Sequence, residues 1–274
     1  MNTMIASKQE WYTNDEGSLD LDFLRQHENL ESLGRFHTPI SSALVLGKFR
    51  EKARSLGMQL VNEQAALHKA GRRYMYTAEV ASETRTGKDG NPEYSLSVGF
   101  RNFGDKSLAF SGMCASRIFV CQNGVCTGIV IPSKMRHTIG NVGNTFFVES
   151  KIDAIFSRFM EDKDAMHGQI ECMKATPLTD SIVGQFVKGL VGNPYIGAAN
   201  TMRIIEDVVS PELNDKNDDS VFRLSNAMSK VTTHKLKNPN HAAMASRFGN
   251  NLIMSIIKPG FVPLGDAIDV GSED

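Results

Sequence analysis

The spacing of apolar residues predicts helices near the start of the chain. Apolar side chains from Leu46 to Leu56 recur at helical intervals, which predicts a helix over residues 41–56 that starts at a serine cap and ends at the following glycine. Residues 60–70 are predicted as a second helix that ends near Gly71.

From residue 73 onward the hydrophobic period changes to two, which is typical of strands. Residues 74–80 are rich in β-formers, residues 94–100 alternate, and the loop 84–92 between them is dense in turn residues. These segments predict a hairpin with a flexible basic tip. The Asn-Gly pair at 123–124 is a strong turn signal, and further strands are predicted at residues 107–111, 117–121, 125–131 and 145–148.

After residue 149 the pattern becomes helical again. Ser150 and Asp153 resemble a capping box, and apolar residues then follow at helical spacing as far as Met160. Thr179 precedes another amphipathic run that ends at Leu190. Further helices are predicted over residues 196–209, 221–235 and 239–257.

Strands that are grouped between two sets of helices indicate an α+β fold. We therefore expect a central antiparallel, hairpin-rich sheet flanked by N-terminal and C-terminal helices, and not an OB-fold. Four regions follow from the pattern: an acidic, loosely ordered segment, a helix pair with a β-rich basic core, a helical region packed on the sheet, and an acidic tail. Their boundaries are residues 1–40, 41–149, 150–258 and 259–274.

Charge is distributed unevenly, although the whole chain has a net charge of −1. Residues 1–43 carry a net −4, residues 44–137 a net +7, and residues 138–274 a net −4. Residues 220–265 hold six basic residues and no acidic one. The middle and this later stretch would attract a polyanion, although the charge blocks are also explained as ordinary solvated surface.

Signatures of catalysis are missing from the sequence. There is no P-loop, no G-x-G-x-x-G after a strand, no H-E-x-x-H and no nucleophile elbow. Cys121, Cys126 and His137 are zinc-ligand types, but their spacing favours buried thiols over a metal site. We therefore predict no metal, no cofactor and no enzymatic activity.

Basic and aromatic residues alternate closely in the middle region, as they do in proteins that bind single strands. The same aromatics could be core residues whose basic neighbours extend to solvent, and this alternative stays open. A second basic stretch follows in the predicted helix from residue 221. The predicted nucleic-acid-binding residues are Lys69, Arg72, Arg73, Tyr74, Tyr76, Arg85, Lys88, Arg101, Phe103, Lys106, Arg117, Lys134, Arg136, Lys230, Lys235 and Lys237.

Three short motifs resemble a phage and plasmid family of unknown-function domains. The first is V-C-Q-N-G at residues 120–124 followed by Arg136-His137-Thr138. The second is N-F-G-D-K-S at residues 102–107, which lacks the family's His and second Gly. The third is N-A-M-S at residues 226–229 with His234 downstream, and together the matches span residues 68–257.

The resemblance implies a viral or mobile-element context. Within it, the chain resembles the single-stranded DNA-binding cofactors of phage RNA polymerase, the Drc type of Schitoviridae phages. This implies a non-catalytic protein that binds single-stranded DNA, recruits a phage RNA polymerase to melted promoters and acts in the cytoplasm of the infected host. No signal peptide or membrane span is expected, and oligomers are compatible with the sequence. A nucleic-acid-processing enzyme and a module that binds an acidic host protein are the alternatives.

Overall fold

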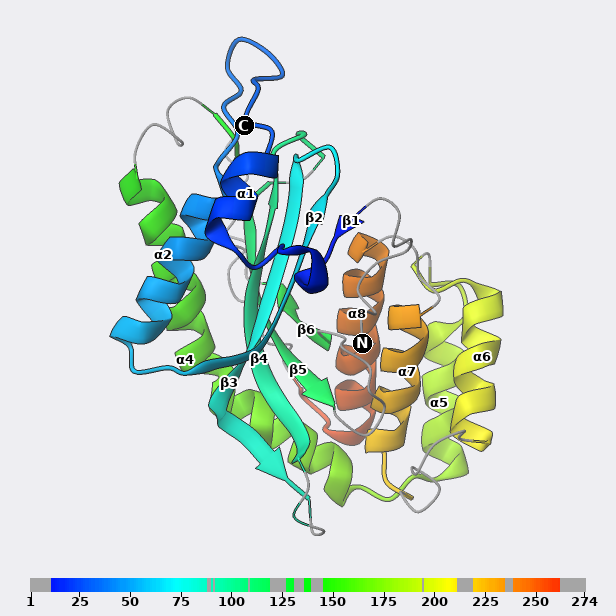
Figure 1. The fold of residues 1–274 in the computed structure, drawn as a ribbon. Coiled ribbons are helices and arrows are strands. Elements are labelled where there is room, and N and C mark those ends of the chain that lie inside the picture. The colour runs from blue at the N-terminus through cyan, green and yellow to red at the C-terminus, as the bar shows by residue number, and fades with distance from the viewer. Residues whose placement is uncertain are drawn as a thin grey trace.

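The fold is an α+β arrangement around a six-stranded antiparallel sheet (Figure 1). A computed structural model describes residues 11–87, 90, 92–107, 109–118, 127–130, 136–138, 145–193, 195–210, 219–234 and 239–261. Within these residues each strand pairs with the next one along the chain. The strands are β1 (Trp11–Tyr12), β2 (Leu60–His68), β3 (Arg73–Thr86), β4 (Pro92–Phe103), β5 (Ser111–Ile118) and β6 (Thr127–Val130). The predicted fold class and the long β3–β4 hairpin are confirmed.

The helix predicted over residues 60–70 is wrong, because these residues form β2. β2 pairs with β3 along its length, and Leu67 lies opposite Tyr74. The segment contains good helix formers, but pairing with a neighbouring strand satisfies its backbone and buries Leu67 completely. Gly71 then turns the chain into β3 with φ of +71°, a conformation that glycine adopts without strain.

Residues 11–40 belong to the fold rather than to a loosely held segment. β1 adds to the edge of β2, and the helix α1 (Leu21–His27) buries Leu24. Ser18 Oγ donates a hydrogen bond to the carbonyl of Ala65, which fixes the connection between β1 and α1 against β2. The short 3₁₀ helix η1 (Asn14–Glu16) lies in this connection.

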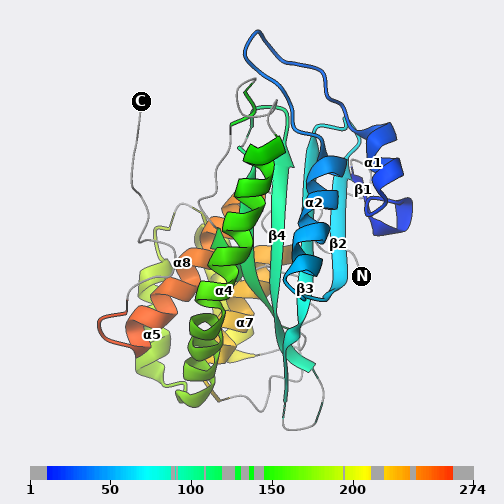
Figure 2. The same ribbon diagram turned by 90° about the vertical axis from the view of Figure 1, so that its left-hand side faces the viewer.

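Two helices lie across one face of the sheet, as Figure 2 shows. They are α2 (Ser42–Ser55), which Ser41 caps as predicted, and α4 (Thr145–Ala175). Phe49 of α2 meets Phe156 of α4 at 4.7 Å and Phe100 of β4 at 5.2 Å between ring centroids. These contacts form the centre of the hydrophobic core.

The strand predicted at residues 145–148 is wrong, because Thr145–Val148 form the first turn of α4. The apolar run Phe146-Phe147-Val148 resembles a strand by composition, but here it continues the helical pattern that buries Val148, Ile152 and Ile155. Met160, which the periodic pattern placed on the buried face, is 48% exposed.

The C-terminal helices pack against one another beside the β6 end of the sheet (Figures 1 and 2). α8 contacts β6, α7 and α5, and α6 contacts α7. Their bounds agree closely with the predicted segments, and Thr179 caps the first of them as expected. They are α5 (Asp180–Leu190), α6 (Ala198–Val209), α7 (Phe222–His234) and α8 (Pro239–Ile257). None of the helices among the described residues is long and apolar enough to cross a membrane.

Candidate nucleic-acid interface

The predicted cations fall at opposite ends of the sheet. The turn between β2 and β3 and the turn after β4 lie at one end, because these strands alternate in direction. We call this the loop end; it comprises residues 28–38, 68–73, 101–107 and 136–138. Arg85 lies at the other end of the strand that holds Arg73. Arg73 pairs with Phe103 and Arg85 with Tyr94, nine residues apart on β4, which is a separation of about 30 Å at a rise of ~3.3 Å per residue. The two groups therefore do not form one compact site.

Cations from two strand connections fasten residues 28–38 to the loop end. Arg72 donates hydrogen bonds to the backbone carbonyl of Glu31 at 3.0 Å and to its carboxylate at 3.1 Å. Lys106 Nζ donates to the carbonyl of Leu33 at 2.8 Å. Chain segments that are far apart in sequence are therefore joined by residues that the sequence singled out for their charge.

Arg73 is committed to a structural ion pair. Its Nε donates to the Asp105 carboxylate at 2.5 Å, and its guanidinium lies 5.8 Å from the centre of the Phe103 ring. Burial raises the pKa of Asp105, but hydrogen bonds from Ser107 and Arg73 outweigh it and hold that pKa below its usual value. Asp105 is therefore charged at neutral pH and neutralises Arg73.

The predicted aromatic platforms Tyr74, Tyr76 and Phe103 do not reach the surface. Both tyrosine side chains are completely buried, and Phe103 is 6% exposed. Tyr74 Oη donates to the carbonyl of Ser18, Tyr76 Oη donates to Glu63, and burial raises the pKa of both phenols. Tyr74 and Tyr76 share one face of β3 because side chains alternate along a strand, and on that face Tyr76 meets Phe49 of α2 at 5.5 Å between ring centroids. They are core residues and cannot stack on bases in this conformation.

An exposed aromatic does lie at the loop end, in a segment that sequence reasoning passed over. Phe36 is 70% exposed, and the guanidinium of Arg35 lies 5.3 Å from its ring centroid. Leu33, which precedes this pair in the same segment, is 42% exposed. The local signal was the R-F pair itself, but the acidic charge of residues 1–43 concealed it.

Two buried histidines lie in the same region. The His37 and His137 rings are 6.0 Å apart between centroids and are 5% and 6% exposed. Nδ1 of His37 accepts from the backbone N–H of Leu33, and Nδ1 of His137 accepts from that of Ile40. Each neutral ring therefore carries its proton on Nε2, and Nε2 of His137 has no hydrogen-bond partner among the described residues.

This tautomer determines what the histidine pair can bind. A nitrogen that carries a proton donates to an oxygen acceptor and cannot ligate a metal without losing that proton. Burial, and then the nearby His37, lower the pKa of His137 to about 4, so its ring is neutral at pH 7. Among the described residues no cluster of three or more His, Cys, Asp or Glu could hold a metal ion.

The remaining predicted residues are dispersed. Arg101 is partly buried and donates from Nε to Ser111 Oγ at 2.6 Å, and burial lowers its pKa. Lys230 of α7 pairs with Asp207 of α6, and Arg136 is exposed next to His137. Arg117 lies on β5 opposite Ser95, at the end of the sheet away from the loop end, and its side chain lies outside the described part of the structure. Outside the described residues lie Lys88, Lys134, Lys235 and Lys237, together with Cys121 and Cys126.

Comparison with known proteins gives no assignment: no family model, no curated protein and no solved structure matches the chain. A function for the chain is therefore inferred from the geometry of the loop end.

Proposed function

We propose that this protein is a non-catalytic single-stranded DNA-binding protein that contacts DNA through its loop end. The observation that supports the proposal is that four separate segments bring cations to the loop end, where the aromatic ring of Phe36 is exposed. The loop-end segments contain seven Lys or Arg and three Asp or Glu, a net charge of +4. The contact surface consists of Arg35, Phe36, Lys69, Arg72, Lys106 and Arg136.

The chemistry of this surface suits a single strand better than a duplex. Arg35 and Lys69 make cation–π contacts with Phe36 and Tyr12 and have no ion pair with a described acid, so both can approach phosphates. Phe36 offers a ring face on which an unpaired base can stack, a contact worth about 1–3 kcal/mol per base. Bases in a duplex are already stacked and are not accessible to such a ring.

The proposal is tested by fluorescence anisotropy with a labelled single-stranded oligonucleotide. For about four neutralised phosphates, log K should fall with log salt at a slope of about −3. Phe36→Ala should weaken single-strand binding about tenfold without changing duplex binding. Arg35→Ala should make the slope shallower by about 0.7, because one phosphate contact is lost.

Lys188→Ala is the matched control for charge. Lys188 is exposed on α5, away from the loop end in Figure 1, so its removal should leave both the affinity and the salt slope unchanged. If Arg35→Ala and Lys188→Ala lower the affinity for the oligonucleotide equally, any surface cation contributes to binding and the loop end is not a specific binding site. A wild-type protein that fails to bind at low salt would exclude the function itself.

Recruitment of a phage RNA polymerase is the finer part of the proposal. It comes from the resemblance of the motifs, and co-purification of the polymerase after nuclease treatment is its test. Loss of the polymerase on nuclease treatment would mean that DNA alone holds the two together.

A further inference from the structure

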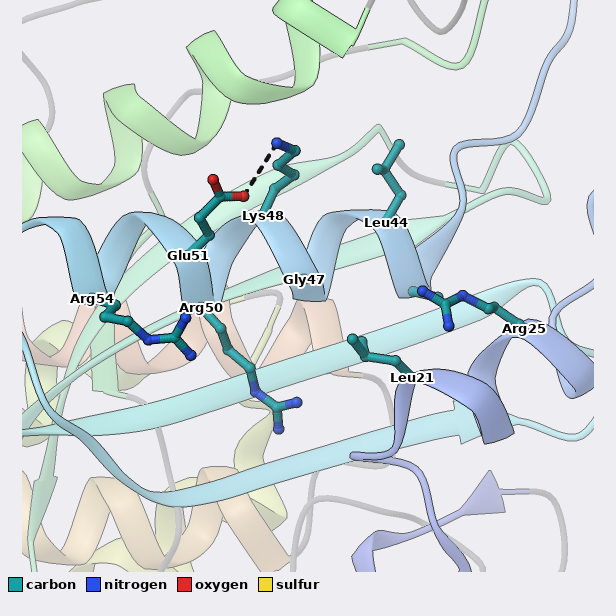
Figure 3. A pocket seen from close by; sticks show the side chains of 9 residues that line it. Leu21, Arg25, Leu44, Gly47, Lys48, Arg50, Glu51 and Arg54 are labelled. Atoms are coloured by element: carbon teal, nitrogen blue, oxygen red, sulfur yellow. Dashed lines mark ion pairs between the residues drawn. The ribbon is translucent and has the colours of Figure 1, made fainter.

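A pocket of about 630 Å³ opens between α1 and the outer side of α2 (Figure 3). Its volume lies within the range of about 300–1,000 Å³ that is usual for small-molecule sites. The pocket does not overlap the loop-end surface defined above. The residues that line it and carry the argument are Leu21, Arg25, Leu44, Gly47, Arg50 and Arg54.

The pocket combines an apolar centre with cations at both ends. Leu21 and Leu44 lie on opposite sides of the α2 ribbon, between Arg25 at one end and Arg50 and Arg54 at the other (Figure 3). The ion pair of Arg25 with Asp22 joins side chains that are 62% and 79% exposed, and pairs of this kind hold weakly. Arg54 is exposed and has no ion pair with a described acid.

The other charges of the lining are already used within the fold. Arg50 donates to the Glu63 carboxylate and to the carbonyl of Leu19, which fixes its guanidinium at the edge of the pocket. Lys48 pairs with Glu51 at 3.1 Å and with Glu149 of α4 at 3.0 Å. The one acid of the lining, Glu51, therefore shares Lys48 with Glu149, and Arg54, together with the weakly paired Arg25, gives the pocket its positive charge.

Gly47 lies in the interior of α2, where glycine costs about 1 kcal/mol relative to alanine. Packing does not require it, because among the described residues an added Cβ would meet only Leu21 Cδ1, at an ordinary distance of 3.9 Å. The glycine does keep the helix backbone open on the floor of the pocket. Glycine at such a place allows a ligand to approach the backbone closely.

We infer that this pocket binds a nucleotide, with its ring against Leu21, Leu44 and the backbone at Gly47 and its phosphate at Arg54. A nucleotide joins a flat ring to an anionic group, which are the two features that the pocket accommodates. The ligand is either a free nucleotide or one nucleotide of a bound strand. The first form is independent of the proposed function, whereas the second rests on it.

Calorimetric titration with deoxyadenosine monophosphate and anisotropy with a labelled oligonucleotide distinguish these two sources. Gly47→Leu fills the pocket and should keep or raise the melting temperature, because leucine favours helix. Arg54→Gln removes the free cation. Each variant should lower the affinity for the ligand about tenfold, which is the effect of losing one contact to a charged group.

Lys52→Gln is the matched control, because Lys52 lies in the same last turn of α2, pairs with Asp153 of α4 and does not line the pocket. If both pocket variants, but not the control, bind the mononucleotide more weakly, the ligand is a free nucleotide. If both pocket variants bind only the oligonucleotide more weakly, the ligand is one nucleotide of a bound strand. Unchanged affinities in both pocket variants, or an equal loss in Lys52→Gln, overturn the inference. Oligonucleotide binding that depends on Phe36 and not on Gly47, together with no binding of the mononucleotide, overturns it too, while the proposed function stands.

Discussion

At the scale of single residues, the buried histidine pair makes the stability of the protein depend on pH. The pKa of His137 in the folded protein is about 4, and that of an unfolded histidine is about 6.5. Burial lowers the pKa of His37 as well. Between these two values the unfolded chain binds more protons than the folded one. The stabilising contribution is therefore complete above about pH 6.5 and is lost as pH falls toward 4.

We predict that His137→Asn removes the part of this dependence that comes from His137, while the part that comes from His37 remains. From pH 7 to pH 5 the wild-type protein should lose about 2 kcal/mol of its free energy of unfolding through His137. An Asn at this position keeps an acceptor for the backbone N–H of Ile40 but does not titrate. Urea denaturation at both pH values measures the difference. If the variant and the wild type lose equal stability, His137 does not titrate on unfolding.

Glu28 is a second residue with a defined local role. Its carboxylate accepts hydrogen bonds from Ser41 Oγ and from the backbone N–H groups of Ser42 and Ala43, at the positive end of the α2 dipole. Glu28→Ala should therefore lower the free energy of unfolding by about 1–2 kcal/mol. Glu31→Ala, at a side chain that is 81% exposed, should cost less than about 0.5 kcal/mol in the same urea titration. Equal costs would contradict the capping role.

At the scale of elements, the sequence predicted best where one pattern decided the outcome. The α2 segment has a cap, an apolar stripe and a terminal glycine, and all three signals agree. The predictions for β2 and for the first turn of α4 were wrong. In both segments the local sequence preference is overridden by strand pairing or packing with residues far away along the chain. Such long-range competition has no signature within a window of ten residues.

The turn between β2 and β3 provides a test at this scale. A Cβ on Gly71 would lie 2.3 Å from the carbonyl oxygen of His27 and 2.6 Å from the backbone nitrogen of Asn29, and φ there is +71°. Gly71→Ala should therefore lower the free energy of unfolding by more than about 2 kcal/mol. Gly90 has a similar φ of +79°, but a Cβ there would have no atom of the described residues within 4 Å, so Gly90→Ala should cost only about 1 kcal/mol. Similar melting temperatures for the two variants would contradict the close approach of residues 27–29.

At the scale of the whole molecule, sequence reasoning found the basic region but not the surface it forms. It selected Arg72 and Lys106 by charge, and it had no means to place Glu31 and Leu33 against them from a segment tens of residues earlier. It selected Tyr74 and Tyr76 because the alternation of β3 shows which residues share a face but not which face is buried. Phe36 was missed because exposure is a property of the fold.

The distance between the two basic groups leads to the last prediction. Arg85 is about 30 Å from Arg73 along the sheet, because their partners Tyr94 and Phe103 are nine residues apart on β4. Its side chain is 46% exposed, donates a hydrogen bond to the carbonyl of Ser82 and lies 3.9 Å from the buried Glu83 carboxylate. An oligonucleotide of about six nucleotides can occupy the loop end alone, whereas one of about twenty can extend toward Arg85. Arg85→Ala should therefore weaken the long oligonucleotide a few-fold and leave the short one unchanged, while Phe36→Ala should weaken both. Anisotropy titrations with both lengths measure this. Equal weakening of the short oligonucleotide by Arg85→Ala would place the strand on the hairpin tip instead of the loop end.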